Sequence, residues 1–195
     1  MGSRTDILAK IKANKPEAIT IPTINVDLFM EDKNLLEEFT KKVEVVGGNV
    51  YKATSNQDII SQISEMIPET KVNFSNLKGT TYFNTVSLEE IQKPHDLEDL
   101  DILVLQSNLG VAENGAIWLT NNEIPMRVLP FITKHLVLVI EKENIVPYLH
   151  QAYDALKAEQ MDFGVFISGP SKTADIEQSL VIGAHGALSL SVFLV

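Results

Sequence analysis

A polar segment near the end of the chain carries the densest group of residues that can bind an anion. Residues 168–186 read SGPSKTADIEQSLVIGAHG and follow the apolar run 163–167, which has the length and composition of a β-strand. Helical spacing over residues 173–182 predicts a helix, whose free backbone N–H groups would face the preceding turn. Four side chains at that turn add hydroxyls and a positive charge: Ser168, Ser171, Lys172 and Thr173. The pattern predicts an anion site; the alternative is an N-capped helix without a ligand.

A second candidate is Glu113, which lies in the glycine-flanked turn GVAENG at residues 110–115. Asn114 and Gly115 favour a turn with positive φ, and a glycine lets the backbone approach a ligand closely. A carboxylate at such a turn can serve as a general base or a nucleophile. We therefore assign Glu113 to catalysis and Asn114 to ligand binding. The alternative is a hairpin turn whose acidic side chain is only hydrated.

Arg127 and His185 extend this set. The guanidinium of Arg127 can bind a carboxylate or phosphate through two parallel hydrogen bonds, although a surface pair with Glu123 is the alternative. His185 lies between Gly183 and Gly186, and an imidazole can transfer a proton near neutral pH. Its alternative is a hydrogen bond to a backbone carbonyl. We assign Arg127 to ligand binding and His185 to catalysis.

Composition narrows the classes of function. The chain has 195 residues, 26 acidic and 16 basic, and a net charge of −10, which disfavours broad contact with nucleic acid or anionic membranes. It has no cysteine, so disulfides, thiol nucleophiles and the usual ligands of iron–sulfur clusters are excluded. Neither a metal-binding motif nor a nucleotide-binding glycine motif occurs, and we expect no metal and no cofactor. Without a signal peptide or an apolar run long enough to span a bilayer, we expect a cytoplasmic protein.

Hydrophobic periodicity predicts alternating helices and strands. The expected helices are residues 6–13, 31–45, 56–67 and 146–157, besides 173–182, with a short helical turn at 87–91. The expected strands are residues 49–53, 71–74, 102–105, 116–119, 136–140, 163–167 and 190–194. The run 102–105 is apolar at every position, which is typical of a strand buried on both faces.

This alternation predicts a single α/β domain with a mixed, largely parallel sheet. Three strands between residues 102 and 140 follow one another without helices, which predicts an inserted antiparallel stretch. We expect residues 1–30 to form a short N-terminal helix and linker, and residues 31–195 to form the folded domain.

The segment 168–186 resembles the C-terminal signature of the LUD-domain family, the LutC/YkgG lactate-utilisation proteins. That signature is an S-G-P-S-[RK]-T-A-D-I-E run followed by G-x-H-G. The turn at 110–115 is similar to the family's glycine-flanked acidic turn. Arg127-Val128-Leu129-Pro130 followed by His135 is similar to its R-x-x-P…H segment, which adds His135 to the ligand-binding set. The resemblance implies a Rossmann-like fold related to the ribose-phosphate isomerase and CoA-transferase superfamily.

The resemblance also implies a component of the lactate-utilisation system, in which iron–sulfur partner proteins oxidise L-lactate to pyruvate. The chain would then bind a small anionic ligand between Glu113, Arg127 and the turn 168–173. The sequence does not decide between a monomer and a homo-oligomer. The rival hypothesis is a stand-alone enzyme that acts on a phosphorylated or CoA-linked small molecule. It rests on the similarity of Glu-Asn-Gly at 113–115 to the glutamate turn of class I CoA-transferases, and it makes Glu113 the base or nucleophile.

Overall fold

The computed structural model describes residues 3–20, 22, 25, 28, 34–157, 162–174, 180–183 and 185–195. Of Thr173, Ala174 and Leu180, within these ranges, it describes the backbone alone. The chain divides into two compact units, Met1–Asp32 and Lys33–Val195. In the first unit, helix α1 (Ser3–Ala13) has no buried residue. The second unit contains all of the strands that the structure describes and the core.

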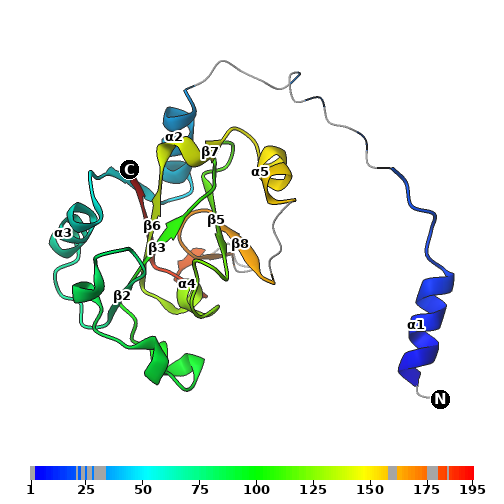
Figure 1. Cartoon of the computed structure of the whole chain (residues 1–195), viewed down its shortest axis with the longest axis horizontal. Helices are drawn as coiled ribbons and strands as arrows, with labels where there is room; N and C mark the ends of the chain where they lie inside the picture. Colours follow the sequence, from blue (N-terminus) through cyan, green and yellow to red (C-terminus); the bar gives the residue numbers. More distant parts are fainter. Residues whose placement is uncertain are drawn as a thin grey trace. The chain divides into compact units, whose positions relative to one another are not determined.

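The second unit is built on a five-stranded sheet in the order β1-β11-β6-β3-β2, with every strand parallel to its neighbours (Figure 1). The strands are β1 (Asn49–Lys52), β2 (Asn73–Ser75), β3 (Ile102–Ser107), β6 (His135–Ile140) and β11 (Ser189–Leu194). The three middle strands are buried at nearly every position, because both faces of the sheet are covered. The prediction for residues 102–105 is thereby confirmed.

A second, four-stranded sheet has the order β7-β4-β5-β8. Its strands are β4 (Gly110–Val111), β5 (Ala116–Thr120), β7 (Ile145–Val146) and β8 (Gly164–Ile167). β5 is antiparallel to both β4 and β8, so the expected antiparallel stretch exists as part of a separate sheet. Val146 lies in β7 and not in the expected helix, because Pro147 disfavours the helical conformation of the residue before it.

The remaining helices of the second unit are short. They are α2 (Leu35–Val45), α3 (Asn56–Met66), α4 (Leu129–Ile132) and α5 (Leu149–Leu156), with the 3-10 turns η2 (Thr81–Phe83), η3 (Leu88–Glu90), η4 (Pro94–Leu97) and η5 (Lys142–Asn144). The side chain of Asn34 caps α2, and that of Ser55 caps α3 by accepting a hydrogen bond from the Asp58 amide at 3.1 Å. None of the helices that the structure describes has the length and apolar content needed to cross a bilayer.

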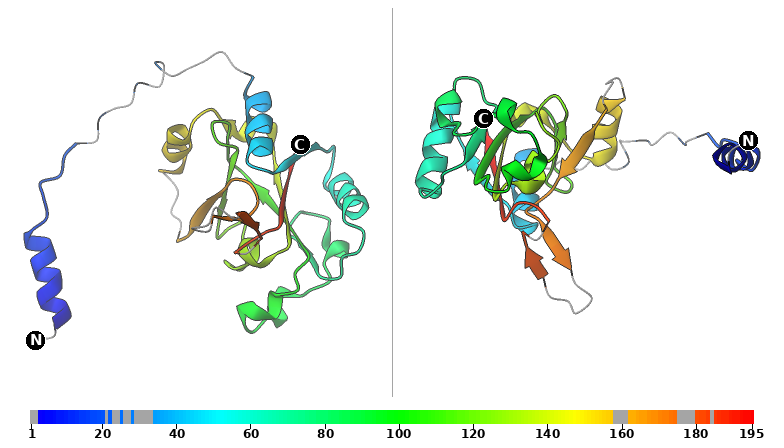
Figure 2. Two further views of the ribbon diagram at one scale, coloured as in Figure 1. Left: turned by 180° about the vertical axis from the view of Figure 1, so that it is seen from behind. Right: turned by 90° about the horizontal axis from the view of Figure 1, so that it is seen from below.

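The elements stack in layers (Figures 1 and 2). Helix α3 covers one face of the central sheet, where Ile59 and Ile63 pack with Val139. The other face packs against α2 and the second sheet, and Phe39 of α2 belongs to that core. Helix α5 covers the outer face of the second sheet, where Ala152 joins a smaller cluster. These arrangements confirm the α/β class with a mixed, largely parallel architecture.

The expected helix over residues 173–182 is wrong. Strands β9 (Lys172–Ala174) and β10 (Leu180–Ile182) pair in antiparallel orientation, with Thr173 opposite Val181. These two residues and Ile182 are β-branched, which favours strands over helices. The expected helix also included Ile176, but residues 175–179 lie outside the described residues. The hairpin projects from the body in the right-hand view of Figure 2, and the anion site that depended on a helix start is lost.

Candidate functional site

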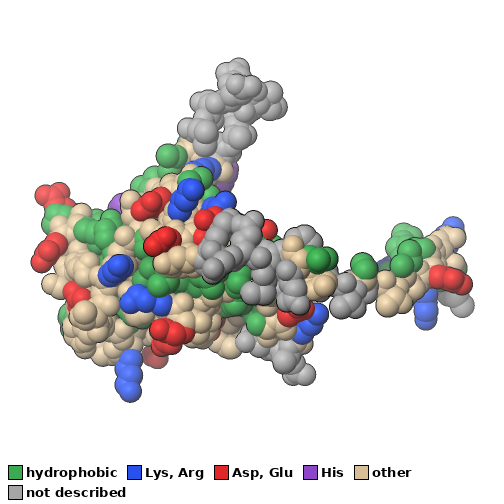
Figure 3. All heavy atoms as spheres, turned by 90° about the horizontal axis from the view of Figure 1, so that it is seen from above, with side chains coloured by type: hydrophobic (Ala, Val, Ile, Leu, Met, Phe, Trp, Pro, Cys, Tyr) green, Lys and Arg blue, Asp and Glu red, His purple; other side chains and the backbone are tan. Residues whose placement is uncertain are grey.

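A groove with a volume of about 360 Å³ lies beside the base of this hairpin. Three of the predicted site residues line it: Ser171, Lys172 and His185. Apolar side chains form much of the remaining wall, among them Phe131 of α4 and Val165 of β8. No Asp or Glu occurs among the described residues that line it. Figure 3 shows one face of the molecule, on which basic, acidic and hydrophobic side chains are interspersed. The groove is therefore suited to an anion that also carries an apolar part.

The groove lies at the amino ends of the central strands. Leu136, near the start of β6, and Ala187, just before β11, both contribute to it. Ligands of open α/β sheets are usually bound at the carboxyl ends of the strands. The groove is at the opposite end. The sequence did not identify Phe131 and Val165 as parts of the site, because neither residue type by itself indicates a ligand.

Backbone hydrogen bonds bring the three polar residues together. The Ser171 N–H donates to the Ala187 carbonyl at 2.9 Å, and the Gly183 N–H donates to the Ser171 carbonyl at 3.1 Å. The Leu188 N–H donates to the Lys134 carbonyl at 2.8 Å, which anchors the loop to the start of β6. His185 is thus held next to Ser171 by the path of the main chain.

The Lys172 ammonium is placed by helix α2. It donates a hydrogen bond to the carbonyl of Val46, the C-cap of that helix, where the helix dipole is negative. An ammonium has three donors, and among the described residues only Val46 accepts one of them, so two are available to a ligand there. The two residues are 126 positions apart in the sequence, and for that reason no local pattern indicated the contact.

The Glu113 turn lies at a different place, at the carboxyl end of β4. The Glu113 carboxylate accepts a hydrogen bond from the Leu149 amide at 2.9 Å and so satisfies an N–H at the start of α5. The backbone N–H of Glu113 donates a hydrogen bond to the carbonyl oxygen of Pro147 at 3.0 Å. The described lining of the groove does not include Glu113. In this structure the carboxylate therefore stabilises the start of a helix.

Two neighbours of Glu113 have structural contacts. Asn114 accepts a hydrogen bond from the Ala116 amide through its own side chain, at 3.1 Å. Gly115 has φ of +64°, and a Cβ at that position would lie 2.7 Å from the backbone nitrogen of Val43. The close approach expected of this glycine is made to helix α2.

Ser168 joins this turn to the chain that leads into the groove. Its Oγ donates to the Asn114 carbonyl at 2.7 Å. Gly169 and Pro170, which follow it, line the groove. The turn and the groove are therefore connected through residues 168–171.

Arg127 lies at the start of β8, whereas Ser168 and the Glu113 turn lie at its end. Its guanidinium is 5.1 Å from the centre of the Phe163 ring, and Phe163 precedes β8 whereas Ser168 follows it. A four-residue strand spans about 13 Å, which separates Arg127 from the Glu113 turn. The carboxylate of Glu123 accepts hydrogen bonds from the amide and hydroxyl of Thr120, at 2.8 and 2.6 Å. The structure thus does not bring Arg127 to the residues with which it was grouped.

His135 lies on the opposite face of the central sheet from the groove. Successive residues of a strand point to opposite faces, so His135 points away from the side to which Leu136 contributes. Its Nδ1 is 2.8 Å from the Oγ of Ser189. Burial lowers the pKa of His135 below its ordinary value, so the neutral ring is favoured. Of Thr173, the last of the predicted residues, only the backbone is described.

Metal binding has no support among the residues that the structure describes. They include no group of three or more His, Cys, Asp or Glu side chains placed to hold an ion. The polar side chains that line the groove supply a hydroxyl, an ammonium and an imidazole group.

Comparison with known proteins identifies related chains. The family profile described as the LUD domain matches residues 36–195. Lactate utilization protein C 1 of Bacillus mycoides (strain KBAB4) is 26% identical over 95% of this chain and 92% of its own length. Lactate utilization protein C of Bacillus pumilus (strain SAFR-032) is 37% identical, but the match covers 47% of this chain and 41% of that protein. A crystal structure of a DUF162 family protein from Deinococcus radiodurans superposes with a TM-score of 0.62, at 16% identity, over 89% of this chain and 99% of that one.

Proposed function

This chain belongs to the LUD-domain family, and from that premise we propose that it is a cytoplasmic component of lactate utilisation that binds a small carboxylate anion. The observation that carries this proposal is the similarity to a protein named lactate utilization protein C 1 over nearly the full length of both chains. The oxidation of L-lactate to pyruvate requires an electron acceptor. Because the chain has no cysteine, cysteine-rich iron–sulfur partner proteins would supply the redox centres.

The proposed ligand site is the groove of Ser171, Lys172 and His185. The ammonium of Lys172 and the hydroxyl of Ser171 can bind a carboxylate, and His185 can donate a further hydrogen bond. The apolar wall suits the carbon chain of a hydroxy or keto acid. Its volume of about 360 Å³ lies in the range of ligand pockets, roughly 300–1,000 Å³.

Growth tests the proposed pathway. A strain without this gene should fail to grow on L-lactate as the carbon source and should grow normally on glucose. A plasmid copy of the gene should restore growth on lactate. Normal growth of the deletion strain on lactate would exclude the proposed role.

Thermal shift tests the ligand site, because a ligand that binds the native state raises its melting temperature. Lactate and pyruvate should stabilise the protein, whereas sugar phosphates and CoA should not. Lys172→Met should weaken binding by roughly tenfold, since a charge-assisted hydrogen bond is lost, and Lys172→Arg should retain most of it. Lys78→Met, at an exposed lysine outside the groove, is the matched control. Equal shifts in Lys172→Met and wild type would show that the groove is not the site.

A further inference from the structure

The apolar wall of the groove extends farther than pyruvate can reach. Val165 and Ile167 of β8 both line the groove, and alternate residues of a strand point to the same face, so these two side chains form one apolar strip. Two residues along a strand span about 6.6 Å. Phe131 of α4 and Leu136 of β6 add to the same wall. The single methyl group of pyruvate covers only part of such a strip.

Much of this wall is open to water. Phe131 is 44% exposed, and Val165 and Ile167 are only half-buried, whereas Leu136 is 2% exposed and belongs to the core. A ligand that covers these side chains removes apolar surface from water, which favours binding in proportion to the area covered. The groove therefore rewards a ligand with a longer apolar chain.

The ammonium of Lys172 lies at the Ile167 end of this strip. Gly169 follows Ile167 by two residues, and a Cβ at Gly169 would lie 2.5 Å from the carbonyl oxygen of Val46. Lys172 donates its hydrogen bond to that same carbonyl. Val165 lies in the opposite direction, two residues back along β8 from Ile167. A carboxylate bound at the ammonium can therefore extend its carbon chain along β8 toward Val165.

We propose that the groove binds 2-oxo acids with an apolar chain longer than that of pyruvate, and that it binds them more tightly than pyruvate. This inference rests on the proposed function, in which the same groove holds the carboxylate. The carboxylate lies at Lys172, and Ser171 or His185 donates a hydrogen bond to the oxygen at position 2. The chain lies along the strip between Phe131 and Val165. The volume of about 360 Å³ accommodates such an acid.

Isothermal titration calorimetry of the full-length protein with a homologous series tests the proposal. Pyruvate, 2-oxobutyrate, 2-oxopentanoate and 2-oxohexanoate differ by one methylene at each step. Each step should lower the Kd by about two- to fourfold, because a methylene moves from water onto a wall that leaves part of it exposed. The heat-capacity change of binding should become more negative along the series. Hexanoate, which lacks the oxygen at position 2, should bind about three- to tenfold more weakly than 2-oxohexanoate.

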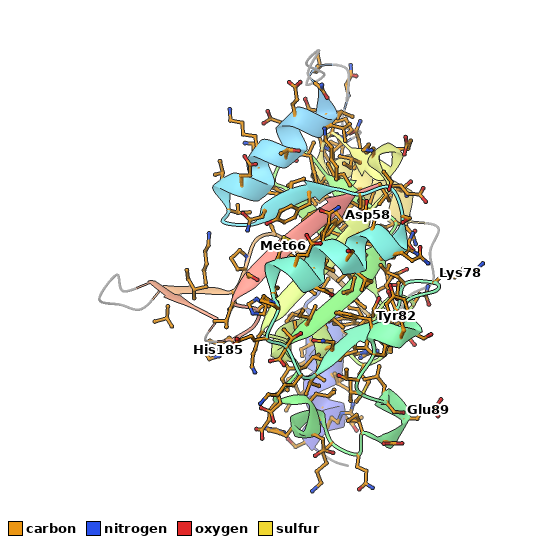
Figure 4. The ribbon with its side chains drawn as sticks, turned by 90° about the vertical axis from the view of Figure 1, so that its left-hand side faces the viewer. Asp58, Met66, Lys78, Tyr82, Glu89 and His185 are labelled. Carbon is orange, nitrogen blue, oxygen red and sulfur yellow. The ribbon has the colours of Figure 1, made fainter. Side chains whose placement is uncertain are left out.

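Substitutions separate the apolar wall from the anion site. Phe131→Ala should leave the Kd of pyruvate within about twofold of wild type and reduce the gain per methylene, whereas Phe131→Leu should keep most of that gain. Lys172→Met should raise the Kd of every acid by about tenfold and leave the gain per methylene unchanged. Tyr82→Ala is the matched control, because Tyr82 is 66% exposed and is not among the described residues that line the groove. In Figure 4, Tyr82 lies apart from His185, which lines the groove.

The outcomes distinguish this inference from the proposed function. Equal Kd values along the series, with pyruvate bound, would overturn the inference and leave the proposed function intact. If none of the acids binds, the groove is not the ligand site and both fail. Binding of the longer acids without pyruvate would support the inference and exclude pyruvate as the ligand.

Two further results would overturn the inference. An unchanged gain per methylene in Phe131→Ala would show that the chain does not lie on this wall. Hexanoate bound as tightly as 2-oxohexanoate would show that the groove binds apolar carboxylates in general and does not select 2-oxo acids. Thermal unfolding of each variant without ligand, compared with wild type, shows whether the fold is preserved.

Discussion

The Oγ of Ser168 donates a 2.7 Å hydrogen bond to the carbonyl of Asn114, although the two residues are 54 positions apart. This bond joins the end of β8 to the turn between β4 and β5. The chain then passes through Gly169 and Pro170 into the groove. A hydroxyl expected to contact a ligand thus connects two parts of the fold.

Ser168→Ala removes this bond and should lower the free energy of unfolding by about 1 kcal/mol. The control is Ser87→Ala, because the exposed Ser87 makes no side-chain capping bond. Urea unfolding of both variants measures the difference. Equal stability of the two variants would show that the bond contributes nothing.

Gly115→Ala should destabilise the fold for two reasons. The residue has φ of +64°, and the added methyl would lie 2.7 Å from the backbone nitrogen of Val43. We expect a loss of about 2–4 kcal/mol, of which the positive φ accounts for about 1–2 kcal/mol. Gly79→Ala isolates the conformational part, since Gly79 has φ of +79° and faces only the end of the Gln57 side chain. Similar losses in the two variants would contradict the contact with helix α2.

Glu113→Ala should lower stability by about 1 kcal/mol, because the Leu149 amide at the start of α5 loses its acceptor. Glu113→Gln keeps an acceptor oxygen and should lose less than half as much. Thermal unfolding separates the two variants. If lactate-dependent growth is supported by Glu113→Gln as well as by wild type, the carboxylate is not a nucleophile. A growth defect in Glu113→Gln with unchanged stability would instead assign chemistry to the side chain.

Arg127→Met should leave anion binding in the groove within twofold of wild type. The guanidinium lies over Phe163, before β8, and is not among the residues that line the groove. Loss of the cation–π contact should cost about 0.5–1 kcal/mol of stability. Thermal shifts with pyruvate, measured beside Lys172→Met, check both statements. A tenfold weaker affinity in Arg127→Met would place the ligand near Phe163.

Acid should weaken the fold through Asp101. Burial by itself would raise the pKa of this carboxyl, but hydrogen bonds from Lys134 and from the amides of Lys71 and Val72 lower it to about 2. The folded-state pKa is below the unfolded value of 3.8, so the stabilisation is complete above that value. It is lost as the pH falls from 3.8 through about 2.

The comparison of wild type with Asp101→Asn tests this pH dependence. The free energy of unfolding of the wild type should fall between pH 4 and pH 2, and that of the variant should fall less steeply. The variant should also be less stable at pH 7. Parallel pH profiles would show that other carboxyl groups account for the acid sensitivity.

Local patterns predicted most of the secondary structure because the information is local. Continuous apolar runs identified β3, β6 and β11. The helix expected over residues 31–45 exists as α2, with Asn34, which that expectation placed inside the helix, as its N-cap. The failure at residues 173–182 has a physical cause. Apolar residues four apart suggested a helix, whereas the β-branched Thr173, Val181 and Ile182 could pair only if the chain turned back on itself.

The sequence by itself determined the α/β class, the family, and the residues with acid, base or anion-binding chemistry, because each depends on residue type and local spacing. Only the tertiary structure decided which of those residues meet. The hairpin β9–β10 places Ser171 and Lys172 beside His185, and the length of β8 keeps Arg127 away from the Glu113 turn. Such distances depend on strand pairing between residues far apart in the chain, and no local pattern encodes that pairing.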